Sequence, residues 1–247
     1  TYGCQMNVSD SELVESLLKK EGYRSINDPD NADVLFVNTC SIREHAEDKV
    51  HSLLGRYNLL KKNKPSMIIG VLGCMAQSLK HDILENRPYV DIVLGPDSYR
   101  KLPELLNRHK ANKKSQVDTQ LSRYEVYDDL FPSRKEGINA WITIMRGCDK
   151  FCTFCIVPFT RGRERSRSPE SIIREIYDLS EKGYREVTLL GQNVDSYLWY
   201  GGGPKKDFIK ASNEQKKNSK RFSNLLDLIA SNFPQIRIRF STSNPQD

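Results

Sequence analysis

Residues 141–155 read Trp-Ile-Thr-Ile-Met-Arg-Gly-Cys-Asp-Lys-Phe-Cys-Thr-Phe-Cys, an apolar run followed at once by three closely spaced thiols. The run from Trp141 to Met145 has the pattern of a buried β-strand. Cys148, Cys152 and Cys155 follow it with gaps of three and two residues. Three thiolates so close together can converge on one metal centre. The stretch therefore predicts a strand that carries a metal site at its carboxyl end.

The residues after this stretch alternate between helix and strand patterns. Ser168-Pro169-Glu170 predicts a helix start, with an N-cap residue and a proline at the first helical position. Further elements are predicted as a strand over 186–190, a helix over 222–233 and a strand over 236–240. Because three strands cannot close a barrel, this half predicts the first part of a barrel-like array.

Residues 1 to about 110 alternate in the same way. Two capping boxes, Ser9–Glu12 and Ser41–Glu44, predict helix starts. Strand and helix alternation of this kind builds a doubly wound parallel sheet with helices on both faces. The predicted strands cover 32–37, 67–72 and 91–94, and later helices cover about 76–86 and the leucines at 102, 105 and 106.

Three more cysteines follow strand segments in the first half. They occur as Tyr2-Gly3-Cys4, Asn38-Thr39-Cys40 and Leu72-Gly73-Cys74. The carboxyl ends of parallel strands are where open α/β sheets place their ligand sites. The alternative is three inert buried cysteines, since free cysteine is often buried. Their repeated placement favours a second metal site.

The ligand set bears on the identity of the metal. A structural zinc site needs four ligands, but no histidine neighbours the second trio of cysteines. A [4Fe–4S] cluster normally takes four thiolates, so a cluster held by three would keep one iron open to a substrate or cofactor. Iron–sulfur clusters therefore fit both trios better than zinc. The four histidines all lie in the first half: His45, His51, His81 and His109.

Composition is that of a globular protein with a modest net charge of +6. The longest apolar runs, such as 67–72, are too short to span a bilayer. No charged-then-apolar leader opens the chain, so we expect reduced thiols in a cytoplasmic protein with no membrane contact. The chain begins at Thr1, without a methionine, which suggests a piece of a longer protein.

Basic residues cluster at two places. Arginines at every second position from Arg161 to Arg167 would share one face of an extended segment, which favours a phosphate-binding role. A second basic run, 205–221, is either a solvated loop or a contact for an anionic partner. Between the two halves, residues 111–138 are polar and predict a linker with a short strand near 124–127.

The motifs together carry a resemblance. The spacing of Cys148, Cys152 and Cys155 resembles the signature of radical S-adenosylmethionine (SAM) enzymes. With the other motifs, the whole chain resembles the family of MiaB-type tRNA methylthiotransferases. Those motifs are Thr1-Tyr-Gly-Cys-Gln-Met-Asn, Asn38-Thr-Cys-Ser-Ile-Arg-Glu, Leu72-Gly-Cys-Met-Ala-Gln, Arg161-Gly-Arg-Glu-Arg-Ser-Arg and Thr188-Leu-Leu-Gly-Gln-Asn-Val.

The resemblance implies an α/β architecture with two domains. Residues 1–112 would be the methylthiotransferase N-terminal domain with an auxiliary cluster, and 113–138 a linker. Residues 139–247 would be the first part of a radical-SAM (β/α) partial barrel, truncated, with the family's C-terminal TRAM domain absent. The family's Ser-His-Pro is Ser243-Asn244-Pro245 here. We therefore expect this 247-residue piece to bind clusters without turning over.

The resemblance also implies an activity and its cofactors. It implies methylthiolation of carbon 2 of isopentenyladenosine next to the tRNA anticodon, with two [4Fe–4S] clusters and two SAM molecules. Cys148, Cys152 and Cys155 would hold the cluster that binds and cleaves SAM. Cys4, Cys40 and Cys74 would hold the cluster that carries the sulfur. The residues expected to approach SAM are Gly191, Gln192, Asn193, Arg163 and Arg165.

Partners and alternatives follow from the same resemblance. It implies an enzyme that acts as a monomer on the anticodon stem-loop of tRNA and takes electrons from a reductant protein such as flavodoxin or ferredoxin. Phe151, Phe154 or Phe159 would stack on the target base, or else pack in the core. Related enzymes modify threonylcarbamoyl-adenosine in tRNA or an aspartate of a ribosomal protein. A non-catalytic metal-binding RNA module is the alternative from another class.

Overall fold

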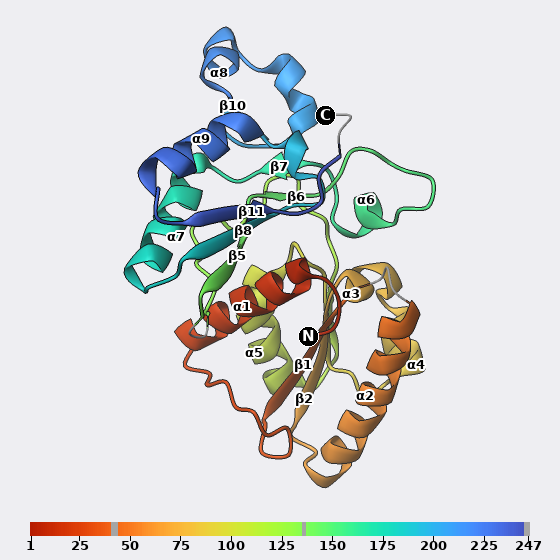
Figure 1. The fold of residues 1–247 in the computed structure, drawn as a ribbon. Helices are drawn as coiled ribbons and strands as arrows, with labels where there is room; N and C mark the ends of the chain where they lie inside the picture. The colour runs from red at the N-terminus through yellow and green to blue at the C-terminus, as the bar shows by residue number, and fades with distance from the viewer. Residues whose placement is uncertain (41–43, 135–136, 245–247) are drawn as a thin grey trace. The chain divides into compact units, whose positions relative to one another are not determined.

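The computed structural model describes residues 1–40, 44–134 and 137–244, which form two compact units, Thr1–Leu121 and Ser122–Asp247 (Figure 1). The first unit contains a parallel sheet in the order β1-β2-β3-β4. Its strands are β1 (Val34–Thr39), β2 (Ile68–Gly73), β3 (Ile92–Leu94) and β4 (Gln116–Asp118). Its helices are α1 (Gln5–Lys20), α2 (Glu44–Asn63), α3 (Cys74–Leu79), α4 (Asp82–Asn86), the short 3₁₀ helix η1 (Tyr99–Lys101) and α5 (Leu102–Asn112).

Helices cover both faces of this sheet. Figure 1 shows α1 and α5 on one side of it and α2, α3 and α4 on the other. On the second side, Val37, Ile69 and Val71 of the strands pack against Val50 and Leu54 of α2. Alternating side chains of a strand point to opposite faces, so a sheet covered on both faces needs the continuous apolar strands that this sequence has.

The second unit is built on a parallel sheet in the order β11-β8-β5. Its strands are β5 (Asn139–Thr143), β8 (Glu186–Leu190) and β11 (Arg237–Phe240), and its long helices are α7 (Pro169–Glu181) and α9 (Phe222–Asn232). Two short antiparallel pairs join β6 (Met145–Arg146) to β7 (Arg165–Ser166), and β9 (Leu198–Trp199) to β10 (Lys220–Arg221). The short helices are α6 (Val157–Thr160), η2 (Val194–Ser196), η3 (Lys205–Lys210) and α8 (Asn213–Asn218).

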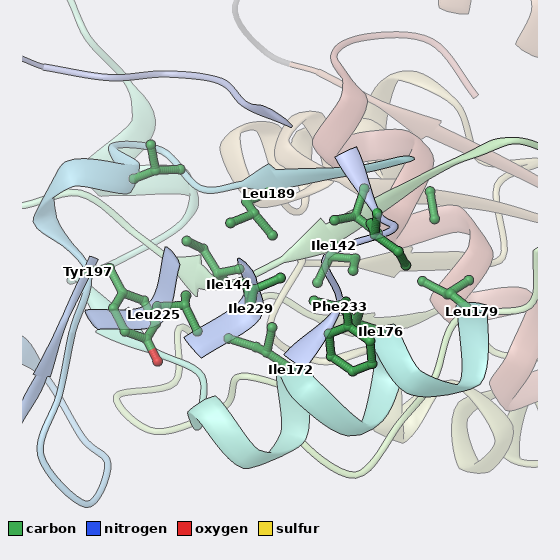
Figure 2. Packing of buried hydrophobic residues seen from close by; sticks show 14 of the residues in the cluster. Ile142, Ile144, Ile172, Ile176, Leu179, Leu189, Tyr197, Leu225, Ile229 and Phe233 are labelled. Carbon is green, nitrogen blue, oxygen red and sulfur yellow. The ribbon is translucent and has the colours of Figure 1, made fainter. Parts of the chain in front are cut away.

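The core of the second unit joins α7 and α9 to the sheet. Figure 2 shows Ile172, Ile176 and Leu179 along α7 and Ile142 and Leu189 of the strands in one cluster. All five are almost completely buried, and burying a side chain of this size contributes about 1.5–3 kcal/mol. The start of α7 is as predicted, since the Ser168 hydroxyl accepts a hydrogen bond from the Ser171 backbone N–H at 3.1 Å. The predicted α/β fold with parallel sheets is confirmed.

Local predictions differ from the structure at three places. The helix predicted to start at Ser9–Glu12 begins earlier, as α1, and Cys4 is its N-cap residue. The strand predicted near 124–127 is wrong, because Tyr127 adopts a φ of +59° and β4 lies earlier in the chain. The helix predicted over about 76–86 is two helices, α3 and α4, broken at Lys80 with a φ of +47°. The start of the second capping box, 41–43, lies outside the described residues.

Gly73 ends β2 in a backbone conformation that side chains rarely adopt, with φ +87° and ψ −153°. A Cβ atom there would lie 2.3 Å from the Asn38 side-chain oxygen and 3.0 Å from the Thr39 carbonyl oxygen. The strand end before Cys74 therefore requires glycine.

We expect Gly73→Ala to lower the free energy of unfolding by about 2–4 kcal/mol, because strain and overlap add. The control is Gly55→Ala in α2, where a Cβ atom meets nothing within 4 Å, and which should stabilise the protein by about 0.5–1 kcal/mol. Urea denaturation of both variants measures the difference. Equal stability of the two variants would contradict the packing described at Gly73.

Candidate metal centres

The first trio of cysteines lies at one edge of the first unit's sheet. Tyr2 bridges to Thr39, and Thr39 pairs with Gly73 in the β1–β2 register. Cys40 and Cys74 are the next residues after Thr39 and Gly73. The Cys40 N–H donates to the Tyr2 carbonyl at 3.1 Å. Since paired strands lie about 4.8 Å apart, the structure places all three cysteines at the same strand edge.

Two buried asparagines support this edge. The Asn7 side chain donates to the Asn38 side-chain oxygen at 3.2 Å, and the Asn38 side chain donates to the Asn7 carbonyl at 3.1 Å. Asn7 also contacts Cys4, whose N–H donates to the Asn7 side-chain oxygen at 3.4 Å. Sequence reasoning assigned no role to either asparagine. The sequence does carry a signal for them: Asn38 is a polar residue in an otherwise apolar strand, and Asn7 lies near the start of a helix. Buried polar groups need partners, so such positions indicate a hydrogen-bonded pair.

The helix start adds electrostatic support for a thiolate. Cys4 caps the 16-residue helix α1. The positive end of a helix dipole favours a negative charge. The sequence prediction missed this because it placed the helix start at Ser9.

The second trio lies in the loop after β5 and β6. Gly147 has a φ of +80°, and a Cβ atom there would lie 2.1 Å from the Arg163 carbonyl oxygen. The Cys148 N–H donates to the Gly162 carbonyl at 3.1 Å. The loop thus packs backbone to backbone against Gly162 and Arg163, with Cys148 buried and Cys152 exposed.

A buried carboxylate fixes the start of this cysteine loop. The Glu164 side chain accepts a hydrogen bond from the Asp149 N–H at 3.0 Å, and the Asp149 side chain accepts one from the Glu164 N–H at 3.2 Å. Ser196 of η2 donates to the same Glu164 carboxylate. Glu164 is therefore a positioning residue for the loop, and sequence reasoning assigned it no role.

Burial raises the pKa of the Cys148 thiol, and the negative charges of Glu164, Cys155 and Cys152 raise it further. The three thiols are thus close enough for their charges to interact. A metal cation at this position would offset the cost of ionising the Cys148 thiol.

All six cysteines are free thiols. Within the described ranges, no three Cys, His, Asp or Glu side chains gather closely enough to hold one metal ion. A single tetrahedral ion needs its thiolates within about 4 Å of one another, whereas each thiolate of an iron–sulfur cluster holds its own iron. The donor set of three thiols without a neighbouring histidine fits a cluster of several irons.

The predicted arginine face is wrong. Arg161, Arg165 and Arg167 are all at most 3% exposed, and β7 covers only Arg165–Ser166, so the alternating arginines do not lie along one extended strand. Arg165 donates to the carbonyls of Glu125 at 2.8 Å and Arg163 at 3.0 Å. The buried side chains cannot form a surface for phosphates.

Arg163 is the exception in this group. Its side chain is 38% exposed, pairs with Asp149 at 2.7 Å and lies over the Phe151 ring at 5.0 Å. Its predicted contact with SAM stays a prediction, as does that of Arg165.

The turn after β8 contacts the cysteine loop directly. The Gln192 side-chain oxygen accepts a hydrogen bond from the Gly147 N–H at 2.6 Å. A Cβ atom at Gly191 would lie 2.6 Å from the Met145 side chain, and Asn193 is buried. The structure thus brings the turn 191–193 to the edge where the cysteines lie. Its predicted role towards SAM remains untested.

The three phenylalanines of the loop lie at the surface. Phe154 is 90% exposed and Phe159 66%, and Phe151 meets Phe159 edge to face at 5.9 Å between ring centres. The alternative of core packing is therefore wrong for them.

Among the described residues, no helix is long and apolar enough to cross a membrane.

Glu175 of α7 is completely buried between two arginines, Arg167 and Arg134. Burial alone would raise the pKa of the Glu175 carboxyl, but the two guanidinium groups hold it below its ordinary value. The pair gives Arg167 a structural role, since it ties the segment after the cysteine loop to α7.

Glu175→Gln should lower the free energy of unfolding by about 3–5 kcal/mol, because two buried arginines lose their counter-charge. The lowered pKa stabilises the protein above about pH 4.3, and this contribution disappears as the pH falls through the folded-state value. The cost of the substitution should therefore shrink in acid. Asp178→Asn on the same helix removes only an exposed pair with Lys182 and should cost about 0.5 kcal/mol or less. Denaturation at several pH values measures both, and equal costs would contradict the buried pair.

Two family models match the chain. The uncharacterized protein family UPF0004 matches residues 1–95, and the radical SAM superfamily matches residues 142–246. Among solved structures, a radical SAM methyltransferase, TsrM, from Kitasatospora setae matches with a TM-score of 0.55 at 12% identity over 93% of this chain and 50% of that chain. The same protein with cobalamin and a [4Fe–4S] cluster bound gives a TM-score of 0.54 at 13% identity over the same shares. At such identity the likeness supports the fold alone. The second half of the chain is therefore similar to the radical SAM superfamily.

Curated relatives are similar to the whole chain and share one name. The tRNA-2-methylthio-N(6)-dimethylallyladenosine synthases of Christiangramia forsetii, Flavobacterium psychrophilum and Bacteroides fragilis are 54%, 55% and 48% identical to it over 249 residues. The matches cover all of this chain and 52%, 52% and 51% of the relatives, so the chain spans about half the length of the curated relatives it matches. The predicted resemblance to MiaB-type tRNA methylthiotransferases is confirmed.

Proposed function

We propose that the protein carrying this chain is a radical SAM methylthiotransferase that modifies carbon 2 of isopentenyladenosine next to the tRNA anticodon. The observation that carries the proposal is the pair of cysteine trios, one at the carboxyl ends of β1 and β2 and one in the loop that follows β5 and β6. The relatives' names supply the substrate. The substrate is tRNA, and the electrons come from a small reductant protein.

The domain assignment is part of the same proposal. Residues 1–112 hold an auxiliary [4Fe–4S] cluster through Cys4, Cys40 and Cys74. Residues 113–138, which begin with β4 of the first unit's sheet, connect the domains, and 139–247 hold a second cluster through Cys148, Cys152 and Cys155. When bound, such clusters supply one-electron chemistry with SAM and a site for the transferred sulfur, neither of which protein side chains can provide.

The chain's own residues fix the position of the cysteines. The Gln192 side chain accepts from the backbone of Gly147 and the Glu164 side chain from that of Asp149, so hydrogen bonds fix the residues on both sides of Cys148. The Asn7–Asn38 pair does the same between the Cys4 helix and the Cys40 strand. Such preorganised backbone keeps ligands in place before a cofactor binds.

Anaerobic reconstitution should load about eight irons per chain and support cleavage of SAM. Replacing Cys4, Cys40 and Cys74 by serine should leave about four irons and retain SAM cleavage. Replacing Cys148, Cys152 and Cys155 should also leave about four but abolish cleavage. Iron analysis and detection of 5′-deoxyadenosine measure this. Zinc in place of iron, without cleavage, would favour the non-catalytic RNA module instead.

The substrate can be tested in cells that do or do not carry the full-length protein. We expect the 2-methylthio group on isopentenyladenosine of tRNA to be lost without the protein, as measured by mass spectrometry of tRNA nucleosides. Loss from threonylcarbamoyl-adenosine, or from a ribosomal-protein aspartate, would assign the protein to a related enzyme of the family instead.

A further inference from the structure

The basic segment, residues 200–221, is attached to the chain that follows the cysteine loop. The Lys205 N–H donates to the Glu164 carbonyl at 2.8 Å, and Pro204 bridges to Arg165. The Lys205 side chain lies 3.5 Å from the Glu164 carboxylate. At its other end, β10 pairs with β9. The segment is therefore held at both ends beside the loop, with a defined surface.

A cavity of about 450 Å³ lies between this segment and the start of the cysteine loop. Its lining includes Lys150 from the loop and Lys206 and Arg221 from the segment. Phe208 and Ile209 of η3 add apolar surface. The cavity has room for a small polar molecule or one unit of a polymer.

The charges of the lining leave a positive excess. Its acids are engaged: Asp149 with Arg163 at 2.7 Å, Glu164 with Lys205, and Asp195 with the Ser243 hydroxyl. Lys206 and Arg221 are exposed and form no ion pair within the described part of the chain. The lining carries four basic side chains against three carboxylates, and this positive excess favours an anionic ligand such as a nucleic-acid phosphate.

The apolar surface lies beside these cations. Phe208 is partly buried and meets Tyr200 edge to face at 5.2 Å between ring centres, which orients its ring. Ile209 is 82% exposed. An ordered aromatic ring next to cations is the combination that binds single-stranded nucleic acid, with the base on the apolar face and the phosphate on the cations.

Resting on the proposed function, we propose that this cavity binds a nucleotide of the substrate RNA that flanks the modified base. Lys206 and Arg221 contact its phosphate, and Phe208 and Ile209 contact its base. The solvated-loop interpretation of the basic run predicts no such contact, so the two can be separated by experiment.

Lys206→Gln combined with Arg221→Gln should weaken binding of an anticodon stem-loop RNA about 10- to 30-fold at about 0.1 M salt. The slope of log affinity against log salt should fall by about 1.4, which is two phosphate contacts in a single-stranded region. The control is Arg174→Gln with Arg185→Gln, which removes the same charge from exposed positions on α7 and before β8 and should leave both quantities unchanged. Fluorescence anisotropy of the labelled RNA measures them.

A second measurement does not depend on affinity. Ile209→p-benzoylphenylalanine should cross-link to the RNA under light, whereas the same group at Tyr177, which is 60% exposed on α7, should not. An unchanged affinity and salt slope in the Lys206/Arg221 variant, or equal cross-linking at both positions, would overturn the proposal.

Iron content and SAM cleavage without RNA separate this proposal from the proposed function. Both double variants should equal the wild type in these two quantities. A wild-type protein without iron or cleavage would contradict the proposed function, whereas intact cleavage with unaltered RNA binding in the cavity variant would contradict only the cavity.

Discussion

Parallel pairing of neighbouring strands is the constraint on which both cysteine sites depend. Thr39 and Gly73 are register partners, and Tyr2 bridges to Thr39, so the residues that follow them emerge at one edge. The second unit repeats the arrangement, because Thr143 of β5 pairs with Leu190 of β8. The cysteine loop and the turn with Gln192 then meet at that edge. A shift in either register would separate the groups that now lie together.

Buried polar groups hold the cysteine segments at these edges. Asn7, Asn38 and Glu164 are at most 3% exposed, and each accepts or donates the hydrogen bonds described above. Leaving a buried polar group without its partner costs about 1–3 kcal/mol, so such contacts make alternative conformations of the loops unfavourable. The buried arginines of the segment 161–167 likewise serve to satisfy buried groups rather than to bind a ligand at the surface. Arg165 donates to backbone carbonyls and Arg167 pairs with Glu175 inside the protein. The exposed cations lie in the basic segment instead.

The sequence predicted the strands and long helices because their apolar periodicity is strong, as along Ile172, Ile176 and Leu179. It also predicted which cysteines lie at strand ends. It misplaced the start of α1 because Ser9–Glu12 matches a capping box, while the N-cap residue is Cys4, which is not a common cap. The alternation of arginines from Arg161 to Arg167 predicted that their side chains share one face of the chain. That inference holds only along a strand, and β7 is only two residues long. The strand predicted near 124–127 failed because Tyr127 is held by a tertiary contact, with Arg146 over its ring at 4.6 Å. The local sequence pattern does not indicate such a contact.

Diffraction at the iron absorption edge from crystals of the anaerobically reconstituted protein tests the two-site account most directly. The account predicts two anomalous peaks, one beside Cys4, Cys40 and Cys74 and one beside Cys148, Cys152 and Cys155. A single peak, or peaks only at the zinc edge, would contradict it.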